Sequence, residues 1–231
     1  MKRDQLLVAL DVESLKAAQK VVNLLGSEVV FYKVGMRLFT KEGPAVLKWL
    51  KKKNKKVFLD LKFHDIPNTV AQAVESATAL GVDLLTIHAS GGPEMMREAV
   101  KAATLSAKKL RKKRPQIFAV TVLTSIDDLS YLGIHRKVSE QVLNFAKLAA
   151  QAKVDGVVCS PEEIRFLKKK FGKKLKLLSP GIRLEDHSKD DQKRIATPVQ
   201  ALKDGADYLV VGRPILQAQN PRLVVKSILK S

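Results

Sequence analysis

One short segment of the chain brings carboxylates and an amine close together. Asp60 and Lys62 belong to the apolar run 57–65, and Asp65 ends that run. Residues two apart on a β-strand point to the same face, so Asp60 and Lys62 would lie side by side while Leu61 points to the other face. Two charges within a buried strand are costly unless they pair, so these residues are expected to form an ion network.

Lys33 adds a second cation to this network from the preceding apolar run, 29–35. A lysine held against carboxylates can deliver a proton, and its fixed charge can stabilise negative charge that develops during a reaction. A purely structural ion-pair network is the alternative. The catalytic interpretation is favoured because the charges lie where strands end and are accompanied by candidate phosphate ligands.

The elements that must position these charges are eight short apolar runs, most of them rich in Val, Leu and Ile, as buried parallel strands are. Strands that alternate with helices predict a parallel α/β fold, and eight such units favour a closed (β/α)8 TIM barrel over an open sheet. Without a linker or low-complexity tract, residues 1–231 are expected to form a single domain. Aromatic residues make up only 5%, so the core would be largely aliphatic. The apolar runs are 6–11, 29–35, 57–65, 84–89, 117–125, 156–160, 175–183 and 207–213. The helix-compatible segments are 14–25, 40–53, 68–80, 93–110, 138–152, 161–171 and 197–204, and the stretch 221–230 closes the chain.

Polar residues cluster where these runs end. In a barrel, the carboxyl ends of all strands meet at one face, which is where barrel active sites lie. A single Asp or Thr at such a position is more often a turn or surface residue, but opposite charges at the ends of three successive strands are harder to explain in that way. The clustered residues are Asp11, Lys33, Asp60, Lys62, Asp65, His88, Thr124, Ser125, Arg183, Gly212 and Arg213.

The last two runs indicate a phosphate site, because barrels often bind phosphate with the loops after strands seven and eight. Gly212 would let the backbone approach a ligand closely, and Arg213 can fork onto phosphate oxygens. The seventh run continues through Arg183 into the hydrophilic stretch 184–198, whose length and polarity are typical of a mobile lid.

The segment 60–69, Asp-Leu-Lys-Phe-His-Asp-Ile-Pro-Asn-Thr, resembles the characteristic motif of the orotidine 5′-phosphate decarboxylase family. Further matches are LDV near the start, YKVG at 32–35, PGIR at 180–183, DQKRIATP at 191–198 and VVGRPI at 210–215. The resemblance implies a carboxy-lyase that converts orotidine 5′-phosphate to UMP in the last step of de novo pyrimidine nucleotide synthesis. It also implies a homodimer with active sites at its interface, and no metal or organic cofactor.

The resemblance also assigns catalytic roles. Lys62 would protonate C6 of the pyrimidine, and Asp60 would lie beside the substrate carboxylate. Lys33 would pair with Asp60 and contact the ribose. Asp65 and Thr69 would reach into the site of the partner subunit.

The remaining roles concern substrate binding. Asp11 would bind a ribose hydroxyl, and Thr124, with Ser125 beside it, would lie near the pyrimidine edge. The choice between Thr124 and Ser125 as the pyrimidine contact stays open. The residues expected at the phosphate are Gln192, Arg213, the backbone of Gly212 and, nearby, Arg183.

The nearest alternative is a Mg²⁺-dependent sugar-phosphate decarboxylase or synthase of the same suprafamily, which shares a similar Asp-x-Lys-x-x-Asp motif. Those relatives share an acidic metal-binding residue at the position where this chain has Lys33. A lysine at that place disfavours a divalent cation. The continuation 66–69, Ile-Pro-Asn-Thr, also favours the orotidylate interpretation.

The net charge of +19 raises a different possibility, a nucleic-acid-binding protein. The basic runs 51–56, 108–114 and 168–176 each follow a helix-compatible segment and precede an odd-numbered strand, so they would gather on the face opposite the active site. They complement helix C-terminal dipoles and lack the interleaved aromatic residues of a base-stacking surface. A solvated surface that also attracts an anionic substrate is therefore favoured, and neither nucleic acid nor membrane is an expected partner.

The chain is expected to be cytoplasmic. The first apolar run is too short for a secretory signal, and no apolar stretch approaches the ~20 residues that cross a bilayer. The single cysteine, Cys159, rules out an intramolecular disulfide and a cysteine-cluster metal site, and a packing role is expected for it. Two isolated histidines, His64 and His88, are expected to support the site rather than to bind metal.

Overall fold

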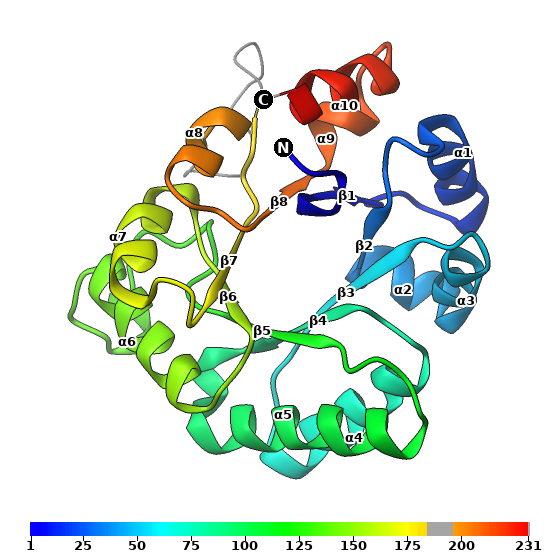
Figure 1. Ribbon diagram of the computed structural model, residues 1–231. Coiled ribbons are helices and arrows are strands. Elements are labelled where there is room, and N and C mark those ends of the chain that lie inside the picture. The colour runs from blue at the N-terminus through cyan, green and yellow to red at the C-terminus, as the bar shows by residue number, and fades with distance from the viewer. Residues whose placement is uncertain (184–195, 231) are drawn as a thin grey trace.

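The computed structural model describes residues 1–183 and 196–230. Within these residues, eight parallel strands close into a barrel, and each strand pairs with its neighbours in sequence order. Figure 1 looks along the barrel and shows the helices as a ring outside the strands. The predicted TIM barrel is therefore confirmed.

The strands are β1 (Leu6–Ala9), β2 (Phe31–Gly35), β3 (Lys56–Phe63), β4 (Leu84–His88), β5 (Gln116–Val120), β6 (Gly156–Val158), β7 (Lys176–Ser179) and β8 (Tyr208–Val211). The helices are α1 (Leu15–Leu25), α2 (Met36–Glu42), α3 (Pro44–Lys52), α4 (Pro67–Ala79), α5 (Gly92–Lys109), α6 (Val138–Gln151), α7 (Pro161–Phe171), α8 (Pro198–Lys203), α9 (Arg213–Leu216) and α10 (Pro221–Lys230). Short 3-10 helices occupy Arg3–Gln5, Ala89–Gly91 and Ser130–Leu132.

The predicted helix 40–53 is wrong in its extent. The chain forms two helices there, α2 and α3, which meet at Gly43. Gly43 adopts a positive φ of 57°, which a residue with a side chain rarely tolerates, and Pro44 then begins α3 because its fixed φ suits the first helical position. The helical signal therefore starts earlier, at Met36, and is broken once.

The core has two layers. The outer layer, between strands and helices, is built mainly from Leu, Val, Ile and Ala, as expected from the low aromatic content. The inside of the barrel is different, because Phe31, Phe58 and Phe118 are buried there and Tyr208 packs edge-on against two of them. Four of the twelve aromatic residues thus fill the barrel interior, where few residues must occupy a large volume.

Three aspartates link neighbouring strands at their amino ends. We call them the clamp aspartates: Asp83, Asp155 and Asp207. Each directly precedes an even-numbered strand. Its carboxylate accepts a hydrogen bond from the backbone N–H of a residue in the preceding odd-numbered strand. The N–H donors are Val57 to Asp83 at 2.8 Å, Ile117 to Asp155 at 2.7 Å and Leu177 to Asp207 at 2.9 Å.

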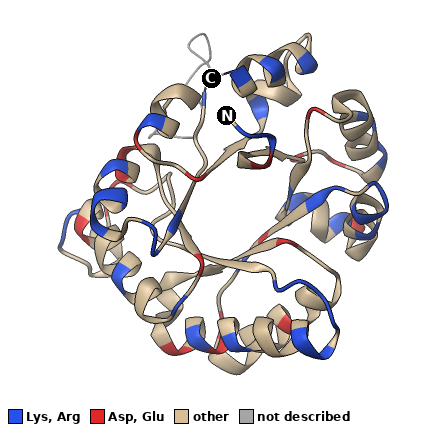
Figure 2. Cartoon of the chain, in the orientation of Figure 1, with Lys and Arg blue, Asp and Glu red and all other residues tan. Residues whose placement is uncertain are grey.

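Each clamp aspartate also binds a cation from one of the three basic runs. The pairs are Lys51 with Asp83 at 2.8 Å, Arg114 with Asp155 at 2.9 Å and Lys168 with Asp207 at 3.0 Å. The basic runs lie between helix ends and strands β3, β5 and β7, as predicted. Figure 2 shows Lys and Arg distributed over the helices around the ring, so the charge is spread rather than confined to one helix.

Among the helices of residues 1–183 and 196–230, none combines the length and apolarity that a bilayer crossing requires.

Candidate active site

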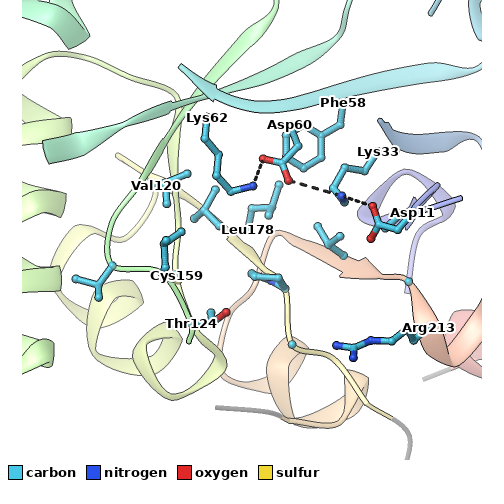
Figure 3. A pocket seen from close by; sticks show the side chains of 18 of the residues that line it. Asp11, Lys33, Phe58, Asp60, Lys62, Val120, Thr124, Cys159, Leu178 and Arg213 are labelled. Carbon is cyan, nitrogen blue, oxygen red and sulfur yellow. Dashed lines mark hydrogen bonds and ion pairs between the residues drawn. The ribbon is translucent and has the colours of Figure 1, made fainter. Parts of the chain in front are cut away.

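A pocket opens at the carboxyl ends of the strands, the face at which the sequence predicts the active site. Charged side chains lie along one wall and apolar side chains form much of the rest (Figure 3). The lining residues are Ala9, Asp11, Lys33, Phe58, Asp60, Lys62, Val120, Val122, Leu123, Thr124, Val158, Cys159, Leu178, Pro180, Gly181, Arg183, Val210, Gly212 and Arg213.

Four charges of alternating sign form a row along the wall, and we call them the charged row: Asp11, Lys33, Asp60 and Lys62. Lys33 Nζ lies 3.0 Å from Asp11 Oδ1 and 3.7 Å from Asp60 Oδ2. Lys62 Nζ lies 2.9 Å from the other oxygen of Asp60, Oδ1. Asp60 therefore lies between two ammonium groups, and the predicted network is confirmed for Lys33, Asp60 and Lys62 (Figure 3). Its fourth member is Asp11 and not the predicted Asp65, whose carboxylate instead accepts the N–H of Ile66.

The charged row is held by neighbouring strands, because Lys33 follows Phe31 on the inward face of β2 and Asp60 follows Phe58 on that of β3. Gly35 is also required here. A Cβ atom at that position would come within 2.9 Å of Lys33 Nζ and 3.3 Å of Asp11 Oδ1. Glycine thus leaves the space in which the first ion pair of the row forms.

The backbone at Lys62 departs from a regular strand. Lys62 has a positive φ of 51°, and the pairing of β3 with β4 is irregular between Leu59 and Phe63. The Lys62 N–H donates to Thr86 Oγ1 at 3.0 Å, so a side chain of β4 accepts this bond. Simple strand alternation is therefore only part of the reason that Lys62 meets Asp60.

Asp60 is held as a carboxylate. Burial of the group opposes ionisation, but Lys33, Lys62 and the hydrogen bonds donated by Lys62 and Thr86 outweigh it and hold the pKa of Asp60 below its ordinary value. The side chain is 12% exposed, so water screens these interactions little. The site thus presents a fixed negative charge between two fixed positive ones.

The imidazoles of His64 and His88 face each other beside the charged row, with ring centroids 5.1 Å apart. Burial, then His64 and Lys62, lower the pKa of His88 from 6.5 to about 4. His88 is therefore neutral near pH 7. Within the described part of the chain, no group of three or more His, Cys, Asp and Glu side chains is arranged to hold a metal ion.

The pocket lining includes two arginines, Arg183 and Arg213. In Figure 3, Arg213 lies on the side of the pocket away from Lys62, together with Asp11. Arg213 begins α9 directly after Gly212, and a Cβ atom at Gly212 would touch Ala9 and Asp11 at 3.4 and 3.5 Å. Arg183 is 6% exposed, and its N–H donates to the carbonyl of Ala196 at 3.0 Å.

Several predicted site residues lie elsewhere. Thr124 lines the pocket, whereas Ser125 is exposed and is not among the lining residues. Asp65 and Thr69 are also exposed and outside the lining, on the loop after β3 and in the first turns of α4. Gln192 and most of the predicted lid lie outside the described residues.

Sequence reasoning missed Thr86, Gly35 and most of the apolar wall, including Val120 and Leu178. Thr86 had a detectable signal, because it is the one hydroxyl residue in the apolar stretch 84–87 and shares its strand face with Leu84. Cys159 was expected to pack, and it is 1% exposed at the edge of the pocket.

Comparison with known proteins agrees with this geometry. Residues 4–228 match the model of the Orotidine 5′-phosphate decarboxylase / HUMPS family. The chain belongs to this family. The match to the decarboxylase family spans the whole barrel, from the 3-10 helix before β1 to α10.

Curated family members are similar over at least nine tenths of their length. The orotidine 5′-phosphate decarboxylase of Idiomarina loihiensis is 48% identical over 236 residues, covering 100% of this chain and 99% of that protein. That of Moorella thermoacetica is 44% identical, covering 98% of this chain and 91% of that protein. A crystal structure of the decarboxylase from Lactobacillus acidophilus superposes with a TM-score of 0.87 at 37% identity, covering 97% of both chains.

Proposed function

We propose that this protein decarboxylates orotidine 5′-phosphate to UMP, the last step of de novo pyrimidine nucleotide synthesis. The observation that carries the proposal is the Asp60–Lys62 pair at one end of the pocket with Arg213 at the other. That arrangement suits a substrate with a reacting carboxylate at one end and a phosphate at the other.

Lys62 is the proposed proton donor. Loss of CO₂ from C6 leaves a carbanion in the plane of the pyrimidine ring, where no neighbouring group delocalises it. A preorganised cation at that atom stabilises the developing charge, and the ammonium group can then protonate it. The contact with Asp60 fixes where that ammonium group lies.

Asp60 is proposed to act on the bound substrate through repulsion. Two carboxylates about 4 Å apart repel by about 4 kcal/mol at an effective dielectric constant near 20. Departure of neutral CO₂ removes this repulsion. We give it a secondary contribution beside the stabilisation that Lys62 provides.

Binding energy remote from C6 must hold the substrate against that repulsion. Arg213 and the backbone of Gly212 are proposed to bind the phosphate, with Arg183 and Gln192 nearby. Asp11 and Lys33 are proposed to contact the ribose hydroxyls, because they lie between the phosphate end and Asp60. Thr124 is preferred to Ser125 as the pyrimidine contact, since Thr124 lines the pocket.

A homodimer is proposed in which Asp65 and Thr69 complete the site of the partner subunit. Both residues are exposed and belong to the same motif, 60–69, as Lys62. A second subunit packed on this surface would bury the carboxylate of Asp65 near a substrate. The protein is proposed to work in the cytoplasm, where pyrimidine nucleotides are made.

No metal or organic cofactor is proposed for the reaction. The support is that the ammonium groups of Lys33 and Lys62 together already neutralise Asp11 and Asp60, the carboxylates that would otherwise attract a divalent cation. A Mg²⁺-dependent sugar-phosphate enzyme of the same suprafamily is the alternative.

One assay separates these functions. The purified protein is mixed with orotidine 5′-phosphate and excess EDTA, and the loss of substrate absorbance is followed. Turnover undiminished by EDTA is expected. Turnover that EDTA abolishes and Mg²⁺ restores would reject a metal-free reaction. No turnover under either condition would reject the proposed function and favour the sugar-phosphate alternative.

A further inference from the structure

Thr86 is a buried hydroxyl that touches both partners of the Lys62–Asp60 pair without lining the pocket. Its side chain is on the inward face of β4, two residues after the buried Leu84, and the residue is 1% exposed. Its hydroxyl donates to Asp60 Oδ1 at 2.9 Å. The same oxygen accepts the backbone N–H of Lys62 at 3.0 Å.

The two bonds depend on one another. A hydroxyl has one proton to donate, and Thr86 directs it to Asp60, which leaves the oxygen lone pairs for the Lys62 N–H. The carboxylate of Asp60 is acceptor-only when ionised, so the direction of the first bond is fixed. One side chain therefore sets both the orientation of the carboxylate and the position of the lysine backbone.

The lysine backbone needs such support. A positive φ at a residue with a long side chain persists only where the surroundings impose it. At Lys62 the regular pairing of β3 with β4 is interrupted. The backbone N–H of Lys62 therefore donates its hydrogen bond to Thr86 Oγ1 and not to a backbone carbonyl of β4. Without that acceptor, a partly buried N–H would lack its bond, and the backbone would be free to return to an extended conformation.

We propose that Thr86 is the positioning residue of this site, acting through Asp60 and the backbone of Lys62 and not through contact with substrate. It holds the ammonium group of Lys62 at the place where C6 of the pyrimidine would lie. This inference rests on the proposed decarboxylase function, because it assigns Thr86 to the chemical step of that reaction.

The test compares three substitutions. Thr86→Val keeps the shape and removes the hydroxyl, whereas Thr86→Ser keeps the hydroxyl and removes a methyl group. Thr78→Val is the matched control, because Thr78 is an equally buried threonine that donates to Val74 O within α4, away from the pocket. Thr86→Ala replaces Thr86→Val in the comparison if the valine variant does not fold.

The expected result is a kcat reduced on the order of 100-fold in Thr86→Val, with KM and UMP affinity little changed, since misplacement of a reacting group by about 1 Å has that effect. Thr86→Ser should stay close to wild type, as should Thr78→Val. The acid limb of the kcat–pH profile should move to higher pH in Thr86→Val alone, because Asp60 loses a hydrogen bond that favours its ionised form. A kcat within about twofold of wild type in Thr86→Val, or equal losses in Thr86→Ser and Thr86→Val, would overturn the proposal.

Crystal structures of the ligand-free Thr86→Val and Thr86→Ser variants test the inference independently of activity. We expect the positive φ at Lys62 and its contact with Asp60 to be lost in the valine variant and kept in the serine variant. An unchanged Lys62 in Thr86→Val refutes the positioning role. An inactive wild-type protein whose valine variant shows the expected displacement refutes instead the proposed decarboxylase function.

Discussion

Lys62 reaches Asp60 from a left-handed backbone, with its Nζ 2.9 Å from Asp60 Oδ1. For most residues this conformation is less stable than the right-handed one by about 1–2 kcal/mol. The chain adopts it next to the candidate reaction centre, where it aims a long side chain back along its own strand. Backbone strain at a site of this kind is typical of preorganised catalytic groups.

Replacement of Lys62 by alanine is expected to abolish turnover and to spare the binding of UMP. The variant lacks the cation and the proton that the proposed reaction needs at C6, while the phosphate end of the pocket is unchanged. Absorbance assays give turnover, and titration calorimetry gives UMP affinity. Lys101→Ala, which removes an exposed lysine of α5, is the control, and near-normal turnover in Lys62→Ala would contradict the assignment.

Replacement of Arg213 by alanine is expected to weaken phosphate binding and to lower kcat/KM by about one to two orders of magnitude. A charge-assisted hydrogen bond to phosphate contributes about 1.5–3 kcal/mol, and this binding energy also supports the chemical step. Added guanidinium ion should restore part of the activity of Arg213→Ala and none of that of Lys62→Ala. The proposed role of Arg213 would be contradicted if guanidinium restored no activity to Arg213→Ala and if phosphite did not promote turnover of a substrate that lacks the phosphate.

Mixing two inactive variants tests the shared site. Lys62→Ala and Asp65→Ala lack groups that we place in the same site but on different subunits. A heterodimer of the two carries one site with both groups intact, so mixing should regain up to about a quarter of wild-type activity under random subunit exchange. Exchange is verified with differently tagged subunits, and a mixture that exchanges and stays inactive would place both residues on one subunit.

His88 is expected to make stability depend on pH. Its pKa is about 4 in the folded protein and 6.5 in the unfolded chain, so the unfolded state binds more protons between these values. The free energy of unfolding should therefore fall as pH drops from about 6.5 toward 4, and this contribution should be fully present above about pH 6.5. Urea unfolding of His88→Gln should show a flatter pH dependence than wild type, and His135→Gln, at an exposed histidine, should not. Identical pH dependence in wild type and His88→Gln would be inconsistent with the lowered pKa.

Asp155→Ala is expected to lower the free energy of unfolding by about 1–3 kcal/mol, because the Ile117 N–H loses its acceptor and Arg114 loses its partner. Urea unfolding measures this change. Glu98→Ala, which breaks the exposed pair of Glu98 with Lys101, should change it by less than about 1 kcal/mol. Activity should remain in both variants once folded, and equal effects on stability would show that the clamp is an ordinary surface ion pair.

The sequence predicts the barrel and most of the charged row well, because both depend on patterns that repeat or lie close together. Lys33 and Asp60 were placed by strand order alone, and the structure places them 3.7 Å apart. The sequence alone does not predict the conformation of Lys62. A positive φ is expected at glycine, and at Lys62 it depends on Thr86, a residue of another strand.

Other features were missed for related reasons. The break at Gly43 required weighing one glycine against a long helical pattern, and the space reserved by Gly35 exists only once Lys33 and Asp11 have met. The preference for Thr124 over Ser125 depends on how the loop after β5 turns, which side-chain types alone do not determine. Local patterns therefore predict elements, whereas contacts between elements determine the details of the site.

The clamp aspartates hold the barrel closed at the amino ends of the strands, while the pocket opens at the other ends. The residues at the two ends of the barrel can therefore change independently during evolution. Loops above the pocket can be exchanged to try new substrates while closure of the barrel is preserved below. For a laboratory evolving new activities, the clamps and their three cations are the residues to leave untouched.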